Sequence, residues 1–141
     1  MKFLSSIILA ASLLTSFTAL AQGDQDVADA RAATDRWMKL MDTEEYAAAW
    51  NSSSEGIRKD MSKFAWTTVA GGTHLILGEV KSRAFKAAQV KPGFAGKFGP
   101  VSFEYVSSYT KSASVRETVT VVHEADGVWR VSGYTFNNDK P

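Results

Sequence analysis

The spacing of hydrophobic side chains along the chain changes once, near residue 75. Before that point, residues that a protein core accepts recur at steps of three and four, which predicts one buried face of a helix. An amphipathic helix is therefore expected over residues 27–41. Its buried face would consist of Val27, Ala30, Thr34, Trp37 and Met41.

The segment that follows this helix is typical of a capping box. In Asp42-Thr43-Glu44-Glu45, Asp42 would accept backbone N–H bonds and Glu45 would bond back to the start of the next helix. A new helix is therefore expected to begin just after residue 45.

Two shorter helices are expected between residues 45 and 72. The first has its larger side chains on one side, at Tyr46, Ala49 and Trp50. The second is expected to start near the serines at 52–54 and to end at Gly71-Gly72, because paired glycines commonly terminate a helix. Its helical spacing is carried by Ile57, Met61 and Phe64.

Beyond residue 75 the period becomes two, which is typical of strands with one buried face. The alternation predicts strands over residues 77–90, 101–110, 115–124 and 128–136. Ala125-Asp126-Gly127 supplies the turn between the last two strands. Helices followed by an antiparallel meander predict an α+β fold, with the helices packed on one face of a four-stranded sheet.

Several segments resemble known families. The acidic turn and the Tyr-Ala-Ala-Ala-Trp sequence of residues 42–50 resemble the helical hairpin of the cystatin-like superfamily, which includes nuclear transport factor 2. Three more segments are similar to the bacterial family named domain of unknown function 4019. They are Leu-Gly-Glu-Val-Lys-Ser-Arg (77–83), Arg-Glu-Thr-Val-Thr-Val (116–121) and Gly-Val-Trp-Arg-Val-Ser-Gly-Tyr (127–134).

This resemblance covers nearly all of the chain after residue 21. The glycine-rich segment 91–100 departs from the usual short connection and leaves the shape of that loop open. The resemblance implies a cystatin-like cone, in which a curved antiparallel sheet wraps around helices, in exported bacterial proteins. It implies no activity.

The N-terminal segment is typical of a secretory signal. Lys2 supplies the positive start, an apolar stretch runs from Phe3 to Leu14, and Ala19-Leu20-Ala21 matches the small-x-small cleavage pattern. Serines and threonines interrupt the stretch and acidic residues follow it, unlike a membrane anchor. The sequence predicts a cleaved signal over residues 1–21, one domain over 22–141, and a periplasmic or secreted protein that is not integral to a membrane.

The amino-acid composition argues against several classes of function. The 141-residue chain contains no cysteine, which excludes disulfides, thiol nucleophiles and thiolate metal sites. Its net charge of +1, which falls to zero without Lys2, argues against nucleic-acid binding. The two histidines are far apart, His74 in an expected loop and His123 at a strand end, so no metal and no cofactor are predicted.

The alternation of residues 115–121 places one acidic side chain on an apolar face. Glu117 shares that face with Val115, Val119 and Val121. A buried carboxylate must be paired or protonated, and Arg83, on the inward side of the first strand, is the natural partner. We therefore expect an Arg83–Glu117 ion pair across the sheet. This pair either fixes the structure or belongs to a binding or catalytic site.

Folds of this superfamily often leave a pocket at the wide end of the cone. In relatives such as ketosteroid isomerases, carboxylates and tyrosines in that pocket transfer protons. Trp66, near the end of the expected third helix, is a candidate for the pocket mouth. The candidate binding residues are Arg83, Glu117, Tyr105, Tyr109, Tyr134 and Trp66.

Five basic residues occur between Val80 and Phe103 with no acid among them. They either line a solvated strand and loop or attract an anion such as a lipid headgroup, a cell-wall polymer or an acidic protein. The residues are Lys81, Arg83, Lys86, Lys91 and Lys97.

The first functional hypothesis is a non-enzymatic module that binds a small apolar or anionic molecule, or another protein of the cell envelope. The second is a small acid–base enzyme of the isomerase or dehydratase type, which uses Glu117 with a tyrosine. The third is a structural homo-oligomer, for instance a homodimer paired through the outer face of its sheet. An enzyme needs Glu117 open to the pocket, a binding module needs a pocket with apolar walls, and an oligomer needs an apolar outer sheet face.

Overall fold

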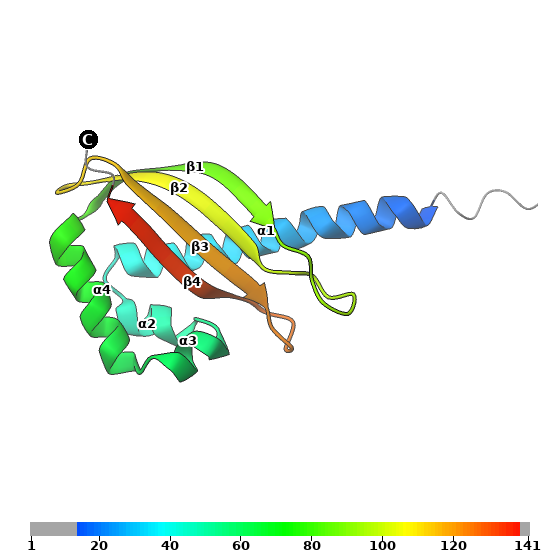
Figure 1. Cartoon of the computed structure of the whole chain (residues 1–141), viewed down its shortest axis with the longest axis horizontal. Coiled ribbons are helices and arrows are strands. Elements are labelled where there is room, and N and C mark those ends of the chain that lie inside the picture. The colour runs from blue at the N-terminus through cyan, green and yellow to red at the C-terminus, as the bar shows by residue number, and fades with distance from the viewer. Residues whose placement is uncertain (1–13, 139–141) are drawn as a thin grey trace, which may run out of the picture.

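The computed structural model describes residues 14–138, in which four helices precede one curved four-stranded sheet (Figure 1). The strands are antiparallel neighbours in the order β1-β2-β3-β4. This arrangement confirms the predicted α+β class. The elements are α1 (Leu14–Asp42), α2 (Tyr46–Asn51), α3 (Glu55–Asp60), α4 (Lys63–Leu77), β1 (Val80–Val90), β2 (Val101–Tyr109), β3 (Val115–His123) and β4 (Trp129–Asn138).

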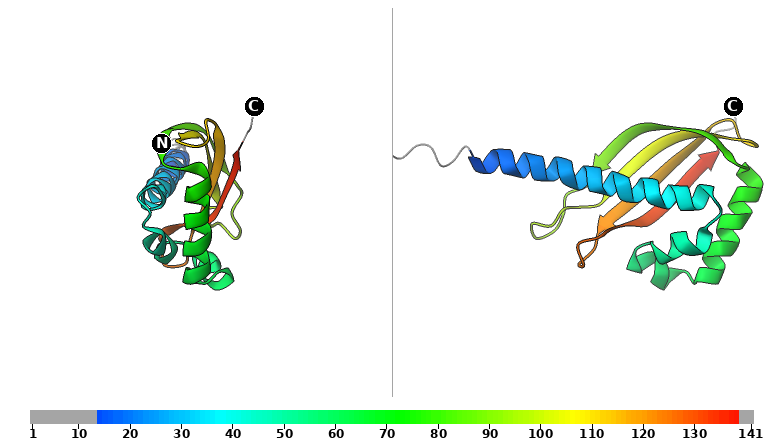
Figure 2. Two further views of the ribbon diagram at one scale, coloured as in Figure 1. Left: turned by 90° about the vertical axis from the view of Figure 1, so that its left-hand side faces the viewer. Right: turned by 180° about the vertical axis from the view of Figure 1, so that it is seen from behind.

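Helix α1 lies across the inner face of the sheet, and α4 stands at one end of it (Figures 1 and 2). Ala30 and Thr34 are fully buried and Trp37 is nearly so, which confirms the predicted buried face of α1. The small side chains at positions 30 and 34 allow the helix to approach the strands closely. The opposite side of the core comes from the strands, mainly from Val101, Phe103, Val119, Val121 and Val131.

Helix α1 begins upstream of the periodic segment, at Leu14, and runs through the predicted cleavage position after Ala21. Residues 1–13 of the predicted signal lie outside the described residues, so the signal remains a prediction. No helix within residues 14–138 is long and apolar enough to cross a membrane.

The predicted capping box is wrong. The residue that precedes α2 is Glu45, and its side chain makes no cap hydrogen bond. The carboxylate of Asp42 instead binds the guanidinium of Arg83. Two charged N–H donors in a fork matched to a carboxylate are stronger partners than the backbone N–H groups of a six-residue helix.

The predicted third helix is divided into two. Ser54 accepts a hydrogen bond from the Ile57 N–H at the start of α3, and Ser62 accepts one from the Ala65 N–H at the start of α4. Between them Met61 is extended, with a φ of −137°. The second serine cap therefore starts a new helix where the hydrophobic spacing alone predicts a continuous one.

Gly71 and Gly72 do not end the helix, contrary to the prediction. Helix α4 continues to Leu77 and ends at Gly78, whose φ is +77°. Glycine terminates a helix where it takes this left-handed conformation, and a Cβ at position 78 would also lie 2.0 Å from the Thr110 Oγ1. As a result β1 starts at Val80 and not at residue 77, and His74 belongs to α4 and not to a loop.

A register irregularity in β4 changes which of its side chains face the helices. Val131 pairs with Val121, and Tyr134 pairs with Val119, so a step of three residues in β4 matches a step of two in β3. Val131 and Tyr134 both contact the core in consequence. The bulge thus aims the Tyr134 hydroxyl inward, toward Glu117.

The turn between β3 and β4 has the predicted position. The Glu124 N–H donates to the Val128 carbonyl at 3.0 Å, and Gly127 takes a φ of +80°. In the glycine-rich loop before β2, whose shape the sequence leaves open, Lys91 and Pro100 are joined by a backbone hydrogen bond of 2.9 Å. This bond closes the base of the loop beside the last pairs of β1 and β2.

Candidate functional site

An open cavity of about 430 Å³ lies between α4 and the sheet, with further lining from the C-terminal end of α1 and from α2. Its walls are largely apolar and aromatic. This volume suits a small organic molecule. The apolar and aromatic part of the lining consists of Trp37, Met38, Met41, Tyr46, Met61, Trp66, Val69, Ala70, Leu77, Val80, Tyr109, Tyr134 and Phe136.

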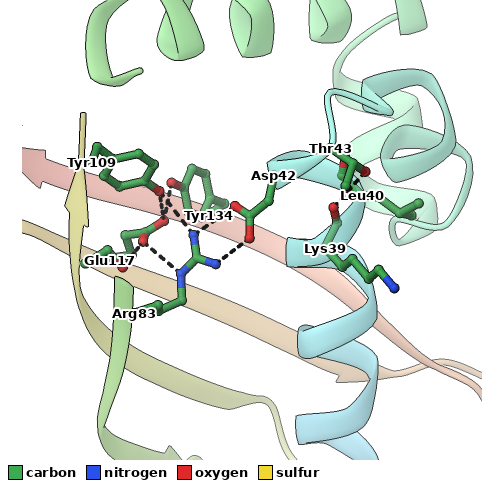
Figure 3. A network of polar contacts seen from close by, with 9 residues as sticks. Lys39, Leu40, Asp42, Thr43, Arg83, Tyr109, Glu117 and Tyr134 are labelled. Carbon is green, nitrogen blue, oxygen red and sulfur yellow. Dashed lines mark hydrogen bonds and ion pairs between the residues drawn. The ribbon is translucent and has the colours of Figure 1, made fainter. Parts of the chain in front are cut away.

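An ion pair between β1 and β3 lies at the sheet side of this cavity (Figure 3). The Arg83 Nε is 3.1 Å from the Glu117 Oε1, which confirms the predicted pair. The Glu117 side chain is 1% exposed and the Arg83 side chain is 16% exposed. Water therefore has little access to either charged group.

Asp42 completes the ion pair from the end of α1. Its Oδ2 and Oδ1 accept hydrogen bonds from the Arg83 Nη1 at 2.7 Å and Nη2 at 3.1 Å (Figure 3). Sequence reasoning assigned Asp42 to a helix cap and missed this role. A usable signal was its position four residues after Met38, which is buried, because residues at that spacing lie on the same side of a helix.

The Glu117 carboxylate accepts hydrogen bonds from four side chains. The Tyr109 hydroxyl donates to Oε2 at 3.0 Å and the Tyr134 hydroxyl donates to the same oxygen at 2.6 Å. Ser107 and Arg83 donate to Oε1. An ionised carboxylate has about four acceptor positions, so Glu117 has none to spare.

Burial and the Glu117 carboxylate together raise the pKa of Tyr109 to about 12. The same two causes raise the pKa of Tyr134 well above its ordinary value. Burial alone would lower the pKa of Arg83, but its hydrogen bonds to Asp42 and the nearby negative charges raise it overall. The tyrosines are therefore neutral donors and Arg83 is charged at neutral pH.

The remaining candidate residues lie in two places. Trp66 lines the cavity, and its ring makes an edge contact with Trp37 at 5.8 Å between centroids. Tyr105 is 3% exposed and lies outside the described cavity lining. Its ring contacts Phe85 at 6.0 Å and the Arg31 guanidinium at 5.4 Å, which is a packing contact between α1 and the sheet.

The two histidines are far from each other, as expected. His74 lines the cavity from α4, and its Nε2 lies 3.1 Å from the Glu44 Oε1. His123 ends β3 and stacks near Trp129. Within residues 14–138, no group of three or more His, Asp or Glu side chains is placed to hold a metal ion.

The basic residues between 80 and 103 separate into two groups. Arg83 belongs to the buried cluster, whereas the four lysines are exposed. Because β1 is an edge strand, exposed lysines along it and its loop oppose pairing with another sheet. Their exposure is compatible with both sequence interpretations, a solvated strand and loop or a surface that attracts an anion. The lysines are Lys81, Lys86, Lys91 and Lys97.

Comparison of this chain with known proteins identifies its family and its fold. The profile of the family described as protein of unknown function (DUF4019) matches residues 33–134. Among curated proteins the sequence has no match.

Solved structures are similar over most of the chain. Aln2 from a Streptomyces species has a TM-score of 0.55 at 14% identity, over 82% of this chain and 91% of its own. A protein from Catenulispora acidiphila has a TM-score of 0.58 at 12% identity, over 84% and 94%. ActVI-ORFA from Streptomyces coelicolor has a TM-score of 0.55 at 12% identity, over 82% and 96%. These similarities confirm the cystatin-like fold.

Proposed function

We propose that this chain, which belongs to the DUF4019 family of proteins of unknown function, is a non-enzymatic module that binds a small, largely apolar molecule in the cavity under α4. The observation that carries the proposal is a cavity of about 430 Å³ whose walls are largely apolar and whose sheet side holds the Arg83–Asp42–Glu117 cluster. Such a site releases water from apolar surface on binding and orients the ligand with a few polar contacts.

In the acid–base alternative Glu117 is the base, and Glu117 is not available for proton transfer. Glu117 is almost completely buried, is paired with Arg83, and accepts four hydrogen bonds. A general base needs a free lone pair within reach of the substrate proton, and Glu117 has already filled its acceptor positions. The two tyrosines donate to Glu117, so their protons are also committed. This geometry disfavours proton transfer by Glu117 with a tyrosine.

The homo-oligomer alternative lacks an apolar outer sheet face. Outward positions on the central strands are mostly small polar or charged, and Ser102 and Thr120 join their hydroxyls there at 2.8 Å. An interface that supports a stable dimer usually has a more apolar centre. The outward positions of β2 and β3 include Ser102, Glu104, Val106, Ser108, Arg116, Thr118, Thr120 and Val122.

We also propose export, on the basis of the signal-like features of residues 1–21. Mass spectrometry of the protein isolated from the periplasm or medium of its bacterial source is expected to give the mass of a chain that begins at Gln22. A chain that retains its first residues in the cytoplasmic fraction would contradict export and leave the binding proposal unaffected.

Filling the cavity tests the binding proposal. Thr73 lines the cavity from α4, so Thr73→Trp is expected to place an indole inside it and to reduce the affinity for an apolar probe at least about tenfold. The measurement is a fluorescence titration with the neutral dye N-phenyl-1-naphthylamine, with urea unfolding to show that the variant folds.

Thr68→Trp is the matched control, because both threonines belong to α4 and donate to the carbonyl four residues earlier. Thr68 is exposed and is not among the cavity residues. It is expected to retain the dye affinity of the unmodified protein. Loss of affinity in Thr68→Trp alone would place the dye on the outer side of α4 and contradict the proposal.

A further inference from the structure

The cluster formed by Arg83, Asp42 and Glu117 has more acceptor than donor capacity left over. Building on the binding function proposed above, we propose that the bound molecule carries a protonated amino group beside its apolar body, and that Asp42 receives this group. The hydrogen-bond capacity of the cluster, its charge, and the aromatic rings around it each support this assignment.

The donors of the cluster are almost all in use. Arg83 has five N–H groups, and four of them bind Glu117, Asp42 and the Tyr109 hydroxyl. The tyrosine protons are directed to Glu117. Asp42, by contrast, accepts one hydrogen bond at each oxygen from Arg83 and keeps about two further acceptor positions. Within this cluster, a ligand that donates therefore finds partners at Asp42, whereas a ligand that only accepts finds one remaining N–H of Arg83. Elsewhere in the lining, the buried Tyr46 hydroxyl has no hydrogen-bond partner within residues 14–138 and can either donate or accept.

The net charge of the cluster also favours a ligand with a protonated amino group. Two carboxylates, Asp42 and Glu117, face a single guanidinium, so the cluster carries one negative charge in excess. The Lys39 side chain on α1 points away from it (Figure 3). His74, on the α4 side, already has the Glu44 carboxylate as a partner. A cation thus gains attraction in this partly buried setting, and an anion is repelled.

Asp42 is the carboxylate that a ligand reaches. Its side chain is 24% exposed, against 1% for Glu117, and it is part of the cavity lining. The Arg83 fork holds it at the end of α1 from the side of the sheet (Figure 3). This contact fixes the orientation of the carboxylate before the ligand arrives, which lowers the entropic cost of binding.

Three aromatic rings line the same cavity, and one of them, Trp37, contacts the other two. Trp37 lies 5.8 Å from Trp66 and 5.5 Å from Tyr134, measured between ring centroids. The faces of aromatic rings attract cations through their quadrupole, and an ammonium group among several rings is a recurrent mode of recognition. The rings also supply the apolar contact that the rest of the molecule needs.

Three probes with the same six-carbon body test the proposal: hexylamine, hexanol and hexanoate. Isothermal titration calorimetry of the mature protein at pH 7 is expected to show hexylamine binding about tenfold more tightly than hexanol, and hexanoate most weakly. Equal affinities, or tightest binding of hexanoate, would overturn the amine assignment and leave the binding function intact. Failure of all three to bind would overturn both.

The variant Asp42→Asn tests whether Asp42 causes the tighter binding of hexylamine. Its hexylamine affinity is expected to fall to that of hexanol, while hexanol binding stays within about twofold and reports an intact cavity. Asp35→Asn is the matched control, because Asp35 also lies on α1 and pairs with an arginine, but is exposed and outside the cavity lining. An equal loss of hexylamine affinity in both variants would contradict the role of Asp42. If Asp42→Asn does not fold, the three probes on the unmodified protein still decide the ligand class.

Discussion

Replacement of Arg83 by methionine is expected to lower the free energy of unfolding by about 3–5 kcal/mol. The Arg83 guanidinium forms ion pairs with both Asp42 and Glu117, and the Glu117 carboxylate is almost completely buried. Without the guanidinium, two like charges remain close together, and one of them is held away from water. Urea unfolding at pH 7, followed by tryptophan fluorescence, measures the loss.

Two variants separate charge pairing from other effects at this position. Lys81→Met changes a basic residue on the same strand, but the residue is exposed, so its effect is expected to stay within about 0.5 kcal/mol. The double variant Arg83→Met/Glu117→Gln removes one of the two carboxylate charges and is expected to lose less than the sum of its single changes. A loss below about 1 kcal/mol for Arg83→Met would show that the cluster is not held by the guanidinium.

The stability of the protein is expected to fall between pH about 10 and 12. The pKa of Tyr109 is raised to about 12 in the folded protein, above an ordinary value of about 10. Below pH about 10 the neutral Tyr109 hydroxyl makes its full contribution to the free energy of unfolding. Above that pH the tyrosine ionises in the unfolded chain while it is still neutral in the folded protein, so the contribution is lost as the pH rises to the folded pKa. With screening of a hydroxyl that is only partly buried, Tyr109 contributes about 1–2 kcal/mol to this loss.

Tyr134 extends the same effect to higher pH, since burial and Glu117 raise its pKa still further. The measurement is the slope of unfolding free energy against pH. Tyr109→Phe and Tyr134→Phe are each expected to reduce this slope, although both variants are less stable at pH 7 because Glu117 loses a donor. A slope unchanged in both variants would show that other groups cause the alkaline loss.

The parity of β3 was sufficient to predict the centre of the site. Glu117 alternates with valines on a strand whose period is regular, and a carboxylate on that face had to be paired or protonated. Arg83 was identifiable because the register of β1 is regular between it and Phe85. Both inferences depend only on the alternation of inward and outward side chains, and the strand register is regular around Arg83 and Glu117.

Other members of the cluster depend on structure that the sequence pattern does not express. Tyr134 faces inward because of the bulge in β4, and simple alternation from Val131 would have directed it outward. Asp42 has a typical capping context, and its true partner, Arg83, is 41 residues away in the sequence. Tyr105 shows the opposite error, since its inward direction is correct but the cavity does not extend to it.

The helices also combine features that the local sequence predicts with features that depend on single residues or on distant contacts. The face of α1 was predictable because its small and aromatic residues repeat over several turns. The division between α3 and α4 depends on one serine, Ser62, and the end of α4 depends on the approach of Thr110 to Gly78. Paired glycines within α4 could not reveal this, because glycine allows termination without requiring it.

The shared hydrogen bonds of Arg83, Asp42, Glu117, Tyr109 and Tyr134 have a consequence for the evolution of the family. Each side chain satisfies at least one other, so a single substitution leaves a buried group without its partner. Accepted substitutions at these positions are therefore expected to occur together. The five positions would be inherited as a set, while the surrounding apolar wall changes one residue at a time to suit different ligands.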